Sequence, residues 1–123
     1  MPVDFELAEA GYNCEKKDID EHQVYQLDVW YSNNYDLYRT YYAWIKNYAR
    51  KMKRGVYTKK LAIKGIANNY VPQIIRHFNK QDEIGLTRIN KCTKLKTGLE
   101  IVNDIETAIK ENGIEYWIKH DGR

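Results

Sequence analysis

Hydrophobic positions follow a helical period in the middle of the chain. Five bulky side chains recur there at steps of three or four residues: Leu37, Tyr41, Trp44, Tyr48 and Met52. At about 100° per residue these positions share one face of a helix. The polar run at residues 32–34 offers N-capping side chains before this segment, and Gly55 follows it. The spacing therefore predicts a helix from about Tyr35 to Lys53.

A second apolar row predicts another helix over residues 59–80. Its members lie four residues apart: Ala62, Ile66, Tyr70, Ile74 and Phe78. Pro72 lies inside this row, and in a regular helix a proline loses one hydrogen bond and collides with the carbonyl four residues earlier. We therefore expect a kink, or two short helices meeting, near Asn68 and Asn69.

Residues 81–91 contain glycine and polar side chains and are predicted to form a loop. A third row of leucine, isoleucine and valine predicts a helix from about Thr93 to Asn112. Gly113 follows as its C-terminal cap. A short helical turn is expected near the N-terminus, over residues 5–10, ending at Gly11.

Two segments alternate between apolar and polar residues, which is typical of strands. Residues 23–31 place Tyr25, Leu27, Val29 and Tyr31 on one side, and residues 114–119 alternate in the same way. Pairing of the two segments would give a small sheet. The predicted fold is α+β and mainly α, with about three helices packed together and a minor two-stranded sheet.

Charge divides the chain more sharply than its net value of +3 indicates. Residues 1–30 hold eight acids, whereas residues 37–81 hold eleven lysines and arginines and no carboxylate. We therefore expect an acidic N-terminal arm over residues 1–22, and a single helical domain with short flanking strands over residues 23–123. Either the arm folds back over the basic middle and neutralises it, or the basic surface meets a polyanion or an acidic protein.

The candidate binding residues are a basic stripe opposite the apolar row of the first long helix (Arg39, Lys46, Arg50 and Lys53), the other cations at the end of that helix, and those at the start of the second. They are Arg39, Lys46, Arg50, Lys51, Lys53, Arg54, Lys59, Lys60 and Lys64. Tyr42 and Tyr57 are candidates for stacking on bases. If the turn at Gly55 folds the helices together, these groups converge on one end of the molecule. An ordinary solvated basic face is the alternative.

Catalytic and metal-binding motifs are absent from the sequence. The three histidines and two cysteines are far apart and lack ligand spacing. We predict no enzyme activity, no catalytic or metal-binding residues and no cofactor.

Cys14 and Cys92 are too few for a disulfide framework, and Cys92 is expected to be a packing residue or an inert thiol. With no signal sequence and no apolar run of membrane-spanning length, these features predict a reducing, cytoplasmic setting and no membrane partner.

One stretch resembles a group of small, mostly uncharacterised proteins from phages, plasmids and integrated elements. The matching residues are Asn34-Tyr35-Asp36-Leu37-Tyr38, Asn47, Lys51, Gly55-Val56-Tyr57, Ala62 and Lys64. They resemble an N-D-x-x-L-Y … N-L-x-x-K … G-x-Y-D … A-x-K layout over about residues 33–109. Tyr35, Tyr48 and Thr58 depart from it, although Thr58 keeps the capping role of the aspartate that it replaces.

The resemblance implies a phage or another mobile element of bacteria as the source. Together with the basic stretch, it predicts a non-enzymatic protein that binds nucleic acid or a nucleoprotein machine of the host. Inhibition of a host defence nuclease, in the manner of an anti-CRISPR protein, is one form of this prediction, and a host protein is a second kind of partner. The alternative is a structural or self-assembling protein whose charges serve solubility and oligomer contacts, and the sequence leaves the oligomeric state open.

Overall fold

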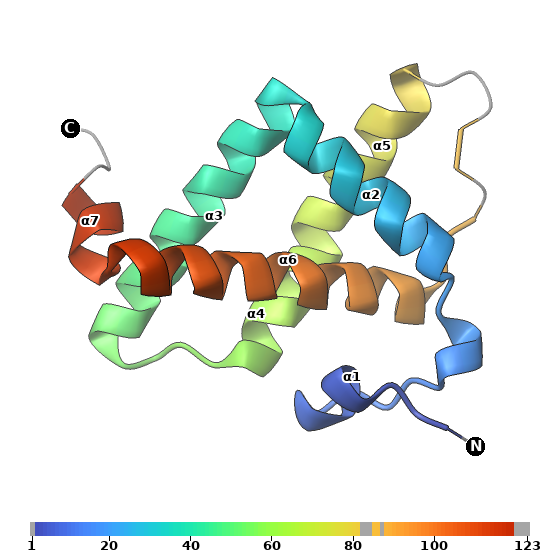
Figure 1. Cartoon of the computed structure of the whole chain (residues 1–123), viewed down its shortest axis with the longest axis horizontal. Helices are drawn as coiled ribbons and strands as arrows, with labels where there is room; N and C mark the ends of the chain where they lie inside the picture. The colour runs from blue at the N-terminus through green and yellow to red at the C-terminus, as the bar shows by residue number, and fades with distance from the viewer. Residues whose placement is uncertain (1, 82–84, 87, 120–123) are drawn as a thin grey trace.

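The computed structural model describes residues 2–81, 85, 86 and 88–119, and these residues are predominantly helical (Figure 1). The elements in chain order are α1 (Phe5–Glu9), the 3-10 turn η1 (Lys16–Asp18), α2 (Glu21–Asn33), α3 (Tyr35–Arg54), α4 (Lys59–Gly65), the π-helical segment η2 (Ile66–Tyr70), α5 (Val71–Gln81), α6 (Lys91–Asn112) and α7 (Ile114–Lys119).

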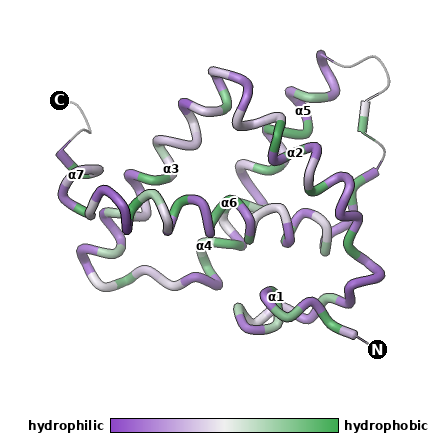
Figure 2. Tube along the Cα trace, in the orientation of Figure 1, coloured by the Kyte–Doolittle hydropathy of each residue, from purple (hydrophilic) through white to green (hydrophobic). Residues whose placement is uncertain are grey.

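Helix α6 is the centre of the fold. In Figure 1 it runs across the middle of the molecule, with α2 and α3 forming an inverted V above it and α4 and α5 rising behind it. Every other α-helix of the described chain packs on it. Its core side chains include Leu99, Ile101, Val102 and Ile105, all nearly inaccessible to solvent. Hydrophobic residues recur along α3, α4 and α6 (Figure 2), as expected of helices that share one core.

The three long helical segments predicted from the apolar rows are confirmed. Helix α3 ends at Gly55, whose φ of 74° lies in the left-handed region that favours glycine. Helix α6 begins at Asn90, whose side chain accepts a hydrogen bond from the Thr93 amide. The short N-terminal turn is also present, as α1. Of the predicted loop, residues 82–84 and 87 lie outside the described residues.

The irregularity expected before Pro72 lies where the sequence places it. Helices α4 and α5 are joined without a break by η2, in which the Val71 amide donates to the Ile66 carbonyl, five residues earlier. The wider turn accommodates a residue that has no amide proton to give. The Asn69 side chain also donates to the Gly65 carbonyl at 2.9 Å.

The predicted strand over residues 23–31 is wrong, because this segment is helix α2. Its buried positions are Gln23, Val24, Leu27 and Tyr31, which is helical spacing, while the alternating residues Tyr25 and Val29 are exposed. Two effects outweigh the strand propensity of its aromatic and β-branched residues. Asp20 caps the helix by accepting from the Gln23 amide at 3.1 Å, and the apolar side packs against α6.

The second predicted strand is also wrong, since residues 114–119 form α7. Trp117 is buried and Ile114 and Ile118 are half-buried, so the contacts follow helical rather than alternating positions. The Trp117 indole donates to the Ala108 carbonyl, which fixes α7 against the end of α6. The α+β prediction is therefore corrected to an all-helical fold. The described residues contain one isolated β-bridge, between Val3 and Glu15, and no strand.

The N-terminal arm is part of the same core as the helices. Leu7, Cys14 and Ile19 are buried in the common hydrophobic cluster. Cys14 forms a disulfide with Cys92 at the start of α6, across a Cα–Cα distance of 5.8 Å. The prediction that Cys92 is an inert thiol is therefore wrong, although Cys92 does pack against the core, and the cysteines no longer support a reducing setting. Among the described helices, none is both long and apolar enough to cross a membrane.

Candidate functional site

The solvent-facing side of α3 carries a row of cations, which we call the α3 stripe: Arg39, Lys46 and Arg50. These residues, with Tyr42 and Ala43, line a shallow hollow of about 390 Å³. Their steps of seven and four residues place them on one side of the helix, opposite the buried Leu37 and Ile45. Within the part of the chain that the structure describes, neither Arg39 nor Lys46 pairs with a carboxylate. The guanidinium of Arg39 lies 5.8 Å from the centre of the Tyr35 ring.

The remaining predicted cations of α3 lie at its C-terminal end. Lys51 is half-buried over the ring of Tyr48, at 5.5 Å from its centre. Lys53 forms an ion pair of 3.0 Å with Glu115 of α7, but both side chains are more than half exposed. Such a pair contributes at most about 1 kcal/mol, so Lys53 can exchange it for another anion. Arg54 is exposed.

The two predicted stacking tyrosines differ in accessibility. Tyr42 is 43% exposed and lies beside the stripe, with one edge contact to Trp117. Tyr57 is half-buried against Tyr48, and its hydroxyl donates to Glu106 of α6 at 2.6 Å. Burial and the neighbouring carboxylate raise the pKa of Tyr57. Tyr57 thus joins the loop after α3 to α6, while Tyr42 presents its ring beside the basic side chains.

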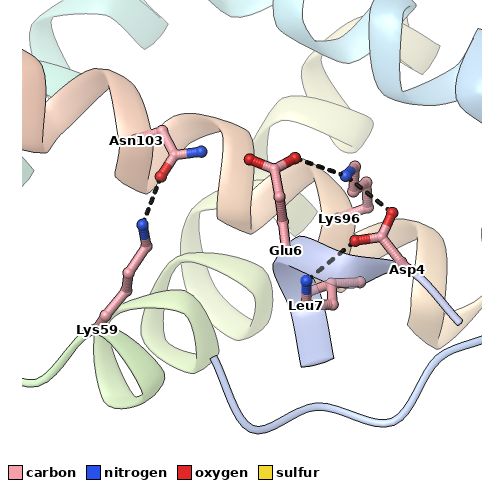
Figure 3. Close-up of polar contacts among 6 residues, drawn as sticks. All are labelled: Asp4, Glu6, Leu7, Lys59, Lys96 and Asn103. Atoms are coloured by element: carbon pink, nitrogen blue, oxygen red, sulfur yellow. Dashed lines mark hydrogen bonds and ion pairs between the residues drawn. The ribbon is translucent and has the colours of Figure 1, made fainter. Parts of the chain in front are cut away.

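Lys59, at the start of α4, is directed toward α6. Its ammonium donates to the side-chain oxygen Oδ1 of Asn103 at 2.7 Å, a contact drawn in Figure 3, and lies 3.2 Å from a Glu106 oxygen. These contacts hold the beginning of α4 against α6. The sequence prediction grouped Lys59 with the binding cations, and the structure gives it protein partners instead.

Lys60 and Lys64 lie on another surface, together with two lysines that the sequence analysis did not single out. Lys60 and Lys64 of α4 and Lys91 and Lys94 of α6 line a pocket of about 520 Å³, the lysine pocket. Its remaining lining residues are Tyr12, Leu61, Ala67, Asn68 and Leu95. None of these described residues is acidic. Five of the nine predicted cations therefore divide between the α3 stripe and this pocket, and the other four belong to neither lining.

A signal for Lys91 and Lys94 is present in the sequence. Lys94 lies in the first turn of the predicted helix and Lys91 lies just before it. Both fall in the first turn of α6, where the helix dipole disfavours cations, and this turn has no acidic residue. Residues that contradict a local preference often serve a binding function.

The acidic arm is held on α6 by three charged residues, which we call the arm clamp: Asp4, Glu6 and Lys96. Asp4 and Lys96 form a buried ion pair, and Glu6 makes the second contact to Lys96. The Lys96 ammonium lies 2.9 Å from Asp4 and 3.1 Å from Glu6 (Figure 3). Burial alone would raise the pKa of Asp4, but the Leu7 amide and the Lys96 ammonium outweigh it and lower that pKa. The same contacts raise the pKa of Lys96 against the effect of its burial. The arm does fold back, and its carboxylates Asp4 and Glu6 pair with Lys96 of α6.

A group of acids lies between α2 and α6. Burial raises the pKa of Asp28, and the charge of Asp104 adds to this effect. Burial likewise raises the pKa of Glu100. Asp104 accepts a hydrogen bond of 2.7 Å from the Tyr31 hydroxyl. Among the described residues, no three histidine, cysteine or acidic side chains are grouped so that they could hold a metal ion.

No family model, no curated protein and no solved structure matches this chain. The resemblance to mobile-element proteins therefore stays a prediction. The functional argument rests on the chemistry of the two basic surfaces.

Proposed function

We propose that the protein is a non-enzymatic binding protein that engages nucleic acid through the α3 stripe. The observation that carries this proposal is the arrangement of Arg39, Lys46 and Arg50 around one hollow with no acidic lining residue. Regularly spaced cations on an exposed helix match the closely spaced phosphates of a nucleic acid. The half-exposed ring of Tyr42 lies beside them, where an unpaired base can stack.

The stripe belongs to a firmly packed helix, and this favours a binding role. The opposite side of α3 is buried through Leu37, Ile45 and Ala49, so the exposed cations project from a fixed backbone. A binding surface on a rigid element positions its groups better than one on a loop. The Arg39 side chain is further oriented by the Tyr35 ring.

The resemblance to mobile-element proteins extends the proposal to a biological setting. A phage or other mobile element is the proposed source, and a host nucleoprotein machine, such as a defence nuclease with its RNA, is the proposed partner. The same basic side chains would contact the RNA of such a complex. A self-assembling protein is the alternative, and light scattering at low and high salt separates it from a monomer that binds nucleic acid.

The test is binding of labelled single- and double-stranded DNA and RNA at about 50 and about 200 mM salt, the range over which phosphate contacts weaken steeply. The variant is Arg39→Glu with Lys46→Glu, and we expect it to lose at least about tenfold in affinity. The matched control is Lys17→Glu with Lys110→Glu, which changes the net charge equally at exposed positions away from the stripe. Equal losses in both variants, or no binding by the unchanged protein at low salt, would contradict the proposal.

A further inference from the structure

We infer that the lysine pocket is a second binding site, which takes a nucleotide: a phosphate-bearing ligand with a flat apolar ring. The site is separate from the α3 stripe, because the two lining sets share no residue. It lies between α4 and the first turn of α6, with Tyr12 of the arm at its edge. Its volume of about 520 Å³ falls within the usual range for small-molecule sites.

The positive charge of the pocket favours an anionic ligand. Four lysine side chains from two helices line one hollow, and within the described chain no carboxylate pairs with Lys64, Lys91 or Lys94. Like charges gathered in this way repel one another and cost stability. The positive end of the α6 dipole adds to the same potential. A ligand carrying two or three negative charges would relieve this repulsion.

The lysines do not contribute equally. Lys60 also borders a neighbouring hollow lined by Glu6 and Glu9, and its ammonium lies over the Tyr12 ring at 5.8 Å. Its charge is thus partly compensated by the arm. Lys64 and Lys94 have no acid among the residues that line the pocket with them. We assign the phosphate groups to the side formed by Lys64, Lys91 and Lys94.

The remaining lining residues define the second half of the ligand. Leu61, Ala67 and Leu95 give the pocket an apolar surface, and the Asn68 amide offers one donor and one acceptor. Leu61 is 63% exposed, so its side chain is accessible to a ligand in the pocket. A base is flat and needs apolar contact together with a few hydrogen bonds. An acyl chain fits less well, because the exposed lining residues leave no enclosed tunnel for it.

The edge formed by the arm is fixed by three contacts. The Tyr12 hydroxyl donates to the Lys60 carbonyl at 2.6 Å, and Cys14 is bonded to Cys92, the residue next to Lys91. Further along α6, Lys96 holds Asp4 and Glu6. The arm edge of the pocket is therefore preorganised, which lowers the entropic cost of binding there.

The test is isothermal titration calorimetry of the full chain with ADP, adenosine and inorganic pyrophosphate. We expect ADP to bind, and adenosine and pyrophosphate to bind at least about tenfold more weakly, because each supplies only half of the contacts. Lys64→Glu with Lys94→Glu should abolish ADP binding. Arg39→Glu with Lys46→Glu should leave it unchanged, so failure of this site and failure of the nucleic-acid surface are distinguishable.

Leu61→Asn provides a second variant at an exposed position. It should weaken ADP and leave pyrophosphate binding unchanged, which no general loss of folding would produce. The ligand has two sources to distinguish, a free nucleotide and the phosphorylated end of a nucleic-acid strand. Oligonucleotides with and without a 5′-phosphate distinguish them. A preference for the phosphorylated strand that Lys64→Glu with Lys94→Glu removes assigns the end of a strand, and equal binding of both strands assigns the free nucleotide. Absence of ADP binding to the unchanged protein, or binding that survives Lys64→Glu with Lys94→Glu, would overturn the inference.

Discussion

Lys94 and Lys96 lie two residues apart on α6, yet their charges have opposite surroundings. The side chain of Lys96 is 9% exposed and its ammonium lies between the carboxylates of Asp4 and Glu6. Lys94 faces the lysine pocket, where the other charged lining residues are also lysines. The arm clamp is a structural contact in which the ammonium is paired with carboxylates. The lining of the pocket contains no carboxylate to pair with its lysines.

The comparison shows that a basic segment of sequence is not the same as a basic surface. Of the lysines in the acid-poor region, Lys59 joins helices through Glu106 and Asn103. Lys64 remains without a carboxylate partner among the described residues. A buried, paired charge holds two elements together, whereas clustered unpaired charges destabilise the free protein and favour a ligand. The predictions below change one side of this comparison at a time.

The largest effect is expected from Lys96→Met. Removing the ammonium leaves the buried carboxylate of Asp4 without its partner, which costs about 3–5 kcal/mol of the free energy of unfolding. Lys94→Met should change stability by less than about 0.5 kcal/mol, because this side chain makes no buried pair. Urea unfolding at pH 7 measures both. Similar losses for the two variants would show that the clamp and the pocket do not differ as described.

The disulfide should contribute nearly as much as the clamp. It closes a segment of 78 residues between Cys14 and Cys92, and such cross-links stabilise by about 2–4 kcal/mol, mainly by restricting the unfolded chain. Cys14→Ser should lower the melting temperature under oxidising conditions, and a reducing agent should lower that of the unchanged protein to the same value. A reducing agent that leaves the unchanged protein unaffected would contradict this expectation.

The fold was predictable from sequence where one apolar row was long enough to fix the period. Helices α3 and α6 have such rows, and the proline marked the irregular segment of the second long helix correctly. The segments that became α2 and α7 are shorter and rich in tyrosine, tryptophan and β-branched residues, which suit a strand as well as a helix. Asp20, the cap of α2, and packing against α6 decide the outcome.

The candidate site was predictable only in its charge. Sequence spacing placed Arg39, Lys46, Arg50 and Lys53 on one side of α3. In the structure the first three line one hollow, while Lys53 pairs with Glu115. Sequence spacing could not show that Lys59 turns toward α6, or that Lys64 meets Lys94 across a pocket, because both depend on how helices distant in sequence cross. The disulfide was missed for the same reason.

The crossing that forms the pocket depends on Gly98. A Cβ atom there would lie 3.1 Å from the Ile63 carbonyl oxygen and 3.3 Å from the Ala67 amide nitrogen, both backbone atoms of the α4 region. Gly98→Ala gains about 1 kcal/mol of helix propensity but should lose more through overpacking, which costs about 1–3 kcal/mol. We expect a net loss of about 1 kcal/mol in urea unfolding, together with weaker ADP binding. Thr107→Ala, at an exposed position of α6, gains propensity without the contact and should stabilise slightly.

The smallest effect concerns how stability depends on pH. Acids on the two sides of α6 change the free energy of unfolding in opposite directions as pH falls. The pKa of Glu100 is raised above its ordinary value of 4.5 by burial, and nearby Asp28 and Asp104 add to the shift. The folded protein therefore binds a proton more readily than the unfolded chain, so this group adds stability as pH falls from 7 toward 4.5. The pKa of Asp4 is lowered below 3.8, and its contribution is present above that pH and is lost as pH falls further.

Glu100→Gln isolates the first of these effects. The variant should be more stable than the unchanged protein at pH 7, by less than about 1 kcal/mol because the acids are only partly desolvated, and the difference should shrink near pH 4.5. Asp4→Asn should show the opposite dependence, with a loss at pH 7 that diminishes as pH falls below 3.8. Urea unfolding at several pH values measures both curves. If the stability of both variants, relative to the unchanged protein, changed with pH in the same direction, Asp4 and Glu100 would have similar electrostatic surroundings. The contrast between a paired and an unpaired carboxylate would then be wrong.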